Sequence, residues 1–124
     1  MMSDICGVVA DKNKGTLTWK CRDQNISINL DGIDQAVADV KQNVVVVLTD
    51  VSTLPEILLV FSCDGKKLAS FSPPDGFQFY YLSEHPELGA SVVCVSSNSI
   101  DGWHDWHFGL DLKGHSLFRH CPSY

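Results

Sequence analysis

The densest group of side chains that can do chemistry lies in segment 100–111, IDGWHDWHFGLD, which holds two Trp, two His and three Asp. Imidazole and carboxylate groups bind divalent metal ions, so the segment invites a metal-site interpretation. On a strand, however, His104 and His107 point to opposite faces because an odd number separates them. A metal would need Asp105 and His107 with His115 or His120, and the spacing fixes no third ligand. We therefore prefer a solvated polar face and predict no metal and no other cofactor.

Other arrangements typical of enzymes do not occur in the sequence. There is no G-x-S-x-G nucleophile motif and no glycine loop of the phosphate-binding kind, and glutamate occurs only three times. We expect a protein without enzymatic activity.

The cysteines are odd in number, scattered and without a CxxC pair, which argues against zinc-ribbon and thioredoxin-type sites. We expect reduced thiols in a cytosolic protein, with Cys63 and Cys94 as inert core residues. The five positions are Cys6, Cys21, Cys63, Cys94 and Cys121.

The elements that must position these residues are mostly strands. Alternation of apolar and polar residues in Thr16–Arg22 and Asn25–Leu30 predicts half-buried antiparallel strands. The continuous apolar runs Val44–Leu48 and Ile57–Phe61 predict strands buried on both faces, so that something covers their sheet on each side. Short turns predict further strands at Ile5–Ala10, Lys67–Ser72, Phe77–Leu82, Ser91–Ser97, Trp106–Leu112 and His115–His120.

One segment follows a different period. Between Asp31 and Gln42, apolar residues occur at the i, i+3, i+4 and i+7 positions of an amphipathic helix, with Asp31 as a candidate N-cap. The pattern predicts a short helix at about 31–42 that covers one face of the central strands. The fold class we expect is mainly β, an antiparallel meander forming a curved sheet or a β-sandwich, with this single helix.

Length and charge limit the function. The 124 residues predict one domain spanning 1–124, and the net charge of -6 disfavours nucleic-acid binding through a basic patch. The N-terminal residues have an acid where a secretory signal needs positive charge, and no apolar run is long enough for a membrane span. We expect a cytoplasmic protein that does not bind membranes.

The acids favour a basic protein partner, because complementary charge accelerates association. Residues 23–124 carry five Lys or Arg against thirteen Asp or Glu, and Trp103 lies among the acids as an aromatic anchor. The surface we predict to bind the partner consists of Glu84, Glu87, Asp101, Trp103, His104, Asp105 and His107, with Asp34 and Asp39 as a second candidate patch.

With its small size, acidic charge and the segment Gly-Trp-His-Asp-Trp-His-Phe-Gly-Leu-Asp-Leu, the chain resembles the small immunity proteins of bacterial polymorphic toxin systems, including the contact-dependent inhibition type. The resemblance implies a protein that binds one cognate toxin domain, often a basic nuclease, and blocks it. The alternative is a small-ligand- or metal-binding β protein that uses the face of Asp105, His107, His115 and His120. A structural module or a subunit of a larger complex is a third possibility.

Overall fold

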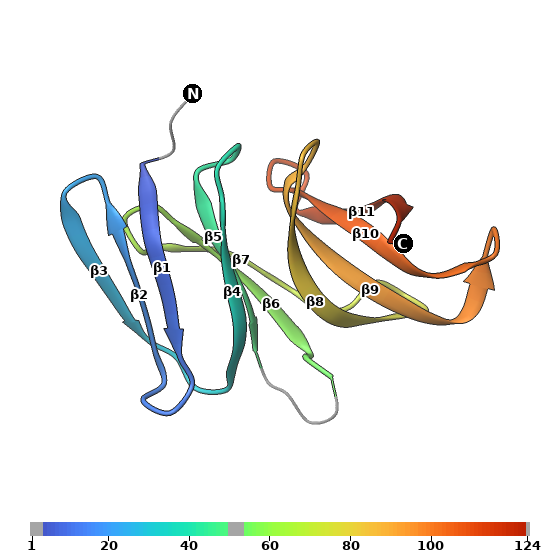
Figure 1. The fold of residues 1–124 in the computed structure, drawn as a ribbon, viewed down its shortest axis with the longest axis horizontal. Helices are drawn as coiled ribbons and strands as arrows, with labels where there is room; N and C mark the ends of the chain where they lie inside the picture. Colours follow the sequence, from blue (N-terminus) through green and yellow to red (C-terminus); the bar gives the residue numbers. More distant parts are fainter. Residues whose placement is uncertain (1–3, 50–53, 124) are drawn as a thin grey trace.

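The computed structural model describes residues 4–49 and 54–123, and in these residues eleven strands form three antiparallel sheets (Figure 1). Residues 1–3, at the start of the segment that we expect not to be a secretory signal, lie outside the described residues. In each sheet, strands adjacent in space are consecutive in sequence, which is the predicted meander. The first sheet contains β1 (Ile5–Asp11), β2 (Thr16–Cys21) and β3 (Gln24–Asn29); the second, β4 (Ile33–Asp39), β5 (Val44–Thr49), β6 (Ile57–Ser62) and β7 (Lys67–Phe71); the third, β8 (Phe77–His85), β9 (Gly89–Ile100), β10 (Trp103–Asp111) and β11 (Ser116–Pro122).

The second sheet is the middle layer, between the blue first sheet and the orange third sheet of Figure 1. Along β5, Val44 and Val46 belong to the core shared with the third sheet, whereas Val45 and Val47 belong to the core shared with the first. The prediction that the two apolar runs are covered on both faces is therefore confirmed. The cover on each side is another sheet.

The predicted helix at 31–42 is wrong, because this segment forms β4 and the turn after it. A register shift between Ile33 and Gln35 inserts an extra residue into the strand. As a result Ile33 and Ala36, three residues apart, both pack toward the first sheet. The bulge thus imitates helical spacing in an extended strand. No helix long and apolar enough to cross a membrane occurs in the residues that the structure describes.

A disulfide joins Cys21, at the end of β2, to Cys63, just after β6. The expectation of reduced thiols is therefore wrong for these two residues, and Cys63 is not a core filler. The Trp19 indole Nε1–H donates to the Cys63 carbonyl oxygen at 2.7 Å, beside the disulfide. Together the two contacts fasten the first sheet to the second.

The third sheet is strongly curled, so that its two edge strands, β8 and β11, approach each other. Trp106 and Phe108 face the core, together with Val92 on the neighbouring strand. Ser91 and Val93 alternate with the core residues of β9 and so lie on the opposite face, yet both are 0% exposed. Their burial shows that this opposite face, which we call the concave face, is also covered.

Candidate functional site

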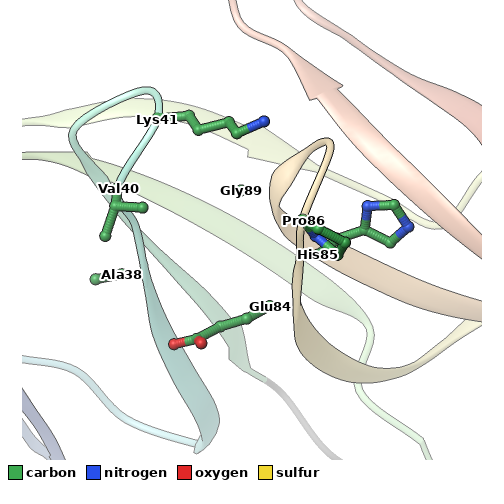
Figure 2. A pocket seen from close by; sticks show the side chains of 7 residues that line it. All are labelled: Ala38, Val40, Lys41, Glu84, His85, Pro86 and Gly89. Carbon is green, nitrogen blue, oxygen red and sulfur yellow. The ribbon is translucent and has the colours of Figure 1, made fainter. Parts of the chain in front are cut away.

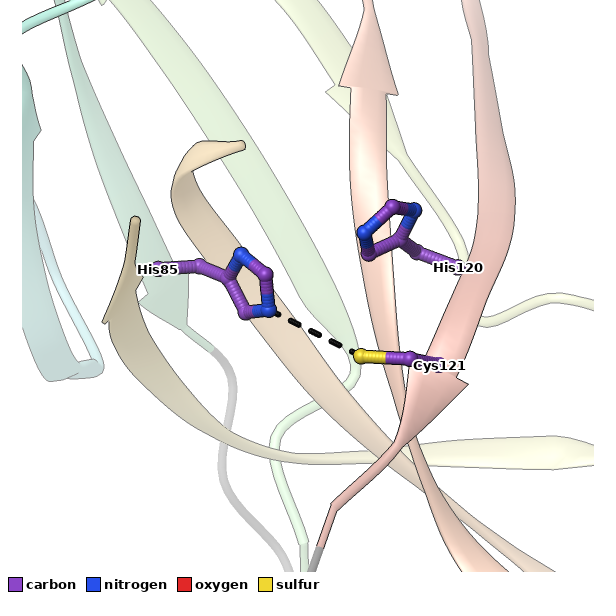
Figure 3. Close-up of side chains that lie close together, drawn as sticks. All are labelled: His85, His120 and Cys121. Atoms are coloured by element: carbon purple, nitrogen blue, oxygen red, sulfur yellow. Dashed lines mark hydrogen bonds between the residues drawn. The ribbon is translucent and has the colours of Figure 1, made fainter. Parts of the chain in front are cut away.

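Three potential metal ligands meet on the concave face. His85 comes from the end of β8, and His120 and Cys121 come from the end of β11; one ligand atom of each lies within 4.8 Å of the others. Figure 3 shows the three side chains directed toward one another from the two strands. The His85 Nε2 atom lies 3.6 Å from the Cys121 Sγ atom.

The curl of the sheet and one bulge produce this cluster. The strand order is β11-β10-β9-β8, so β8 and β11 are opposite edges of the sheet. Next to the cluster, Cys121 pairs with His107 and Arg119 pairs with Phe108, which leaves His120 as the extra residue of a bulge. Bulges redirect side chains, and here the result is that His120 and Cys121, although consecutive, both contribute to one cluster.

His107 stands beside the cluster on β10. Its ring centroid lies 5.0 Å from that of His85, and its Nδ1 atom lies 2.8 Å from the hydroxyl of the buried Ser91. Desolvation lowers the pKa of His107 below its usual value, and the nearby charges of His85 and His120 lower it further. The cluster therefore favours the neutral imidazole at this position, which is the form that binds metals.

The β8–β9 turn fixes the orientation of His85. The backbone N–H groups of Glu87 and Leu88 donate to His85 Nδ1 at 3.1 and 3.4 Å, so the proton of the neutral ring is on Nε2, facing Cys121. A carboxylate oxygen of Glu87 also lies 3.7 Å from His120 Nε2. The turn thus brings a negative charge next to the cluster.

The metal-binding face suggested by the sequence is not assembled as a set. His107 and His120 each lie against His85, but the His115 ring packs 5.1 Å from the Phe71 ring, and Asp105 is hydrogen-bonded through its carbonyl oxygen to the Ser123 N–H. Sequence reasoning missed His85 and Cys121. Cys121 could have been found from the β10–β11 hairpin, because pairing the two strands outward from their turn places Cys121 opposite His107.

The predicted acidic surface is divided between two ends of the molecule. Glu84 and Glu87 lie at the β8–β9 turn, whereas Asp101, Trp103 and His104 lie at the β9–β10 turn. The twelve residues of β9 separate these turns, a distance of roughly 35–40 Å along the strand at the rise of a β-strand. Figure 1 shows the turns at opposite ends of β9. The predicted residues therefore do not form one continuous surface, and their contact with a partner stays a prediction.

The second candidate patch is also changed by the structure. Asp39 is 0% exposed, and its carboxylate accepts hydrogen bonds from the backbone N–H groups of Lys41 and Gln42, both at 3.0 Å. It holds the β4–β5 turn and presents nothing to a partner, so its assignment to a binding patch is wrong. Asp34 is half-buried, with Lys12 Nζ 3.7 Å from its carboxylate.

A pocket of about 400 Å³ separates the β4–β5 turn from the β8–β9 turn. The exposed Val40 and the side chain of Lys41 line one side, and Glu84 lines the other (Figure 2). Lys41 Nζ donates to the Glu87 carbonyl oxygen at 2.7 Å and ties the two turns together. His85 also lines the pocket, but its ring points away from Val40 and Lys41 in Figure 2.

Residues 97–104 form an irregular projection that we call the docking arm; in it Trp103 pairs with Ile100, and the register shifts before Asp105 pairs with Val95. The strand β8 begins opposite Ser96, and the far edge of the sheet ends where Ser123 N–H donates to the Asp105 carbonyl oxygen. The arm extends past both neighbours and ends in a turn at Asp101 and Gly102, whose φ angles are +51° and +84°. Two positive φ angles at the turn suit a tight hairpin that matches the twist of its strands.

The docking arm exposes an aromatic side chain next to polar and charged ones. Trp103 is 39% exposed, and Asp101 and His104 are exposed beside it. His104 Nδ1 lies 2.8 Å from the Ser96 carbonyl oxygen, and Trp106 Nε1–H donates to the Trp103 carbonyl oxygen at 3.2 Å. These contacts fix the base of the arm. Its sequence contains no Lys or Arg.

Comparison of the chain with protein-family models, with curated proteins and with solved structures finds no match.

Proposed function

We propose that this protein is an immunity protein that binds a cognate, basic, nuclease-like toxin domain in the bacterial cytoplasm and blocks its active site without catalysis. The observation that supports this proposal best is the docking arm. It presents a partly exposed Trp103 beside Asp101 on a preformed hairpin without basic residues. A basic, phosphate-binding cleft would accept such an acidic hairpin as it accepts nucleic acid.

The local structure of the arm adds to the argument. Binding costs free energy when a loop must be ordered, and the pairing of Trp103 with Ile100 next to the Asp101-Gly102 turn limits the freedom of the tip. Tryptophan is enriched among the residues that dominate protein–protein binding energies. The proposal therefore assigns the anchor to Trp103 and electrostatic steering to Asp101, with Asp105 at the base of the arm.

The cytoplasmic location is opposed by one feature. Disulfides are rare in the reducing cytosol, and the Cys21–Cys63 bond joins two of the three sheets. The compartment is therefore tested separately from the binding function. Cells are quenched with acid and alkylated, and the redox state of Cys21 and Cys63 is read by mass spectrometry. Stable oxidation of this pair in the native cells would contradict the cytoplasmic location.

The binding function is tested by recovering the tagged protein from its native cells at low salt and identifying what co-purifies in equal amount. We expect a basic toxin domain that inhibits growth when it is expressed alone and becomes harmless when this protein is co-expressed. The Trp103→Ala variant should lose this protection. An equimolar partner that is not toxic, or protection that survives the change at Trp103, would overturn the proposal.

The matched control is Asp23→Lys. Asp23 is exposed in the turn between β2 and β3, in the first sheet. Its replacement by lysine changes the net charge by the same amount as Asp101→Lys. Loss of protection in the Asp101→Lys variant together with full protection in the Asp23→Lys variant assigns the effect to the arm. Equal loss in both variants would show that only the total charge matters.

A further inference from the structure

We propose that His85, His120 and Cys121 form a binding site for one zinc ion on the concave face of the third sheet. The three ligand atoms already lie within 4.8 Å of one another. A set of imidazole nitrogens and a thiolate sulfur binds zinc in preference to magnesium and calcium, because those two ions take oxygen ligands. This site is independent of the docking arm, which begins at residue 97.

The distance between His85 and Cys121 suits a shared metal ion. Zinc binds nitrogen at about 2.0–2.1 Å and sulfur at about 2.3 Å, so a tetrahedral site separates these two atoms by about 3.5 Å. The His85 Nε2 atom and the Cys121 Sγ atom are 3.6 Å apart. The third ligand, His120, requires a larger adjustment, because the three ligand atoms together span up to 4.8 Å. His120 is the extra residue of the bulge in β11, where the backbone permits local movement.

The surroundings favour a cation. The Glu87 carboxylate lies 3.7 Å from His120 Nε2 and supplies negative charge beside the ligands. The Ser91 hydroxyl, 2.8 Å from His107 Nδ1, orients the adjacent His107 ring. Three protein ligands on a half-buried surface leave the fourth position of the zinc ion to water, as in sites where zinc acts as a Lewis acid.

Binding moves protons. The Cys121 thiol proton leaves to solvent, and zinc replaces the hydrogen on His85 Nε2, so that the neutral ring carries its proton on Nδ1. That nitrogen accepts from the backbone N–H groups of Glu87 and Leu88 in the present arrangement. The backbone of the β8–β9 turn must therefore change conformation when zinc binds, so that these two N–H groups no longer point at Nδ1. The amide resonances of Glu87 and Leu88 provide a specific readout.

The test uses the full chain with its purification tag removed. Zinc binding is measured by calorimetry after dialysis against a chelator, and Co²⁺ serves as the spectroscopic probe. We expect one zinc ion per chain, a sulfur-to-cobalt charge-transfer band and shifts of the Glu87 and Leu88 amide resonances. Absence of stoichiometric zinc binding, or zinc binding without movement of these resonances, would overturn the proposal.

The variants separate this site from adventitious binding. Cys121→Ser should abolish the charge-transfer band, and Cys121→Ser and His85→Gln should each weaken zinc binding at least tenfold, as loss of a ligand does. Cys6→Ser and His115→Gln are the controls, because an exposed thiol on β1 and a histidine whose ring packs beside that of Phe71 lie outside the cluster. Equal affinity in Cys121→Ser and Cys6→Ser would contradict the assignment. Circular dichroism confirms that each variant is folded.

Discussion

His85 and Cys121 lie on the two opposite edge strands of one four-stranded sheet, yet their Nε2 and Sγ atoms are 3.6 Å apart. In a flat sheet, strands β8 and β11 would be about 14 Å apart, because neighbouring strands are about 4.8 Å apart. The contact therefore requires a strong curl. A second contact between the same edges, from the Tyr81 hydroxyl to the Ser123 hydroxyl at 3.2 Å, supports this geometry.

Small residues in the middle of the curled sheet make the approach possible. Ser91 occupies the concave side of β9 beside His107, and its small side chain leaves room for the edges to approach. Gly109 plays a similar part on β10, where the ring of Phe118 covers it. The zinc site that we propose would join the two edges and stabilise the curl when the metal is bound.

Replacing Gly89 by alanine should destabilise the protein. Gly89 has a φ of +87°, and an added Cβ would lie within 2.9 Å of the Asp39 carboxyl carbon. Asp39 cannot move away easily because it is buried and accepts hydrogen bonds from the β4–β5 turn. We expect Gly89→Ala to lower the free energy of unfolding by about 2–3 kcal/mol. Urea denaturation in the presence of a chelator measures the change.

The matched control for this prediction is Gly109→Ala. An added Cβ there would also collide, but with the ring of Phe118, which is 42% exposed and can rotate into solvent. We expect a loss below about 1.5 kcal/mol. Losses of equal size in the two variants would contradict the role of the Asp39–Gly89 contact.

The two buried central strands could be predicted from the sequence because their composition leaves little choice. Five consecutive apolar residues at 44–48 cannot alternate between core and solvent, so both faces of β5 must be covered. The helix prediction failed at Ile33 and Ala36, where a bulge gives a strand the three-residue spacing of a helix. Single-sequence periodicity does not distinguish these cases, because a bulge is set by pairing with the neighbouring strand.

The candidate sites were predictable to different degrees. Trp103 and Asp101 were identified because a turn between two strands exposes its residues, and both are exposed in the structure. The His85–Cys121 pair could not be found, because its formation depends on the curl of a whole sheet. Asp39 was assigned to the surface because the sequence does not distinguish a buried aspartate that accepts hydrogen bonds from turn N–H groups from an exposed one.

The Cys21–Cys63 disulfide should contribute strongly to stability. It closes a loop with a sequence separation of 42 residues. A cross-link of this length lowers the entropy of the unfolded chain enough to stabilise the fold by about 4 kcal/mol. We expect the double variant Cys21→Ser and Cys63→Ser to lose about this much in urea denaturation. The Cys6→Ser variant should behave like the parent protein, and a double variant as stable as the parent would show that the bond contributes nothing.

The free thiols should differ in reactivity. Burial raises the pKa of Cys94 to about 12, so at mildly alkaline pH almost none of it is thiolate, the reactive form. Cys6 is exposed on β1. In the native protein we expect an alkylating reagent to modify Cys6 quickly and to modify Cys94 only after unfolding in denaturant. Peptide mapping by mass spectrometry identifies the modified residues. Fast native modification of Cys94 would contradict its burial in the core between the second and third sheets.

Charge reversal on the docking arm should slow association with the partner that we propose. Asp101 is exposed at the tip, and Asp105 lies half-buried at the base. Replacing both by lysine removes the attraction for a basic partner and introduces repulsion. We expect the affinity to fall at least about tenfold, mainly through a lower association rate constant, because exposed interface charges act on the encounter step.

Salt dependence separates steering from the loss of direct contacts. Surface electrostatics weaken as the Debye length falls from about 30 Å at 0.01 M to about 8 Å at 0.15 M ionic strength. The difference between the parent and the Asp101/Asp105 double variant should therefore shrink with added salt, whereas the effect of Trp103→Ala should persist as faster dissociation. Surface plasmon resonance at several ionic strengths measures both rate constants. If the charge-reversed arm associates as fast as the parent protein at low salt, then the arm does not steer the encounter.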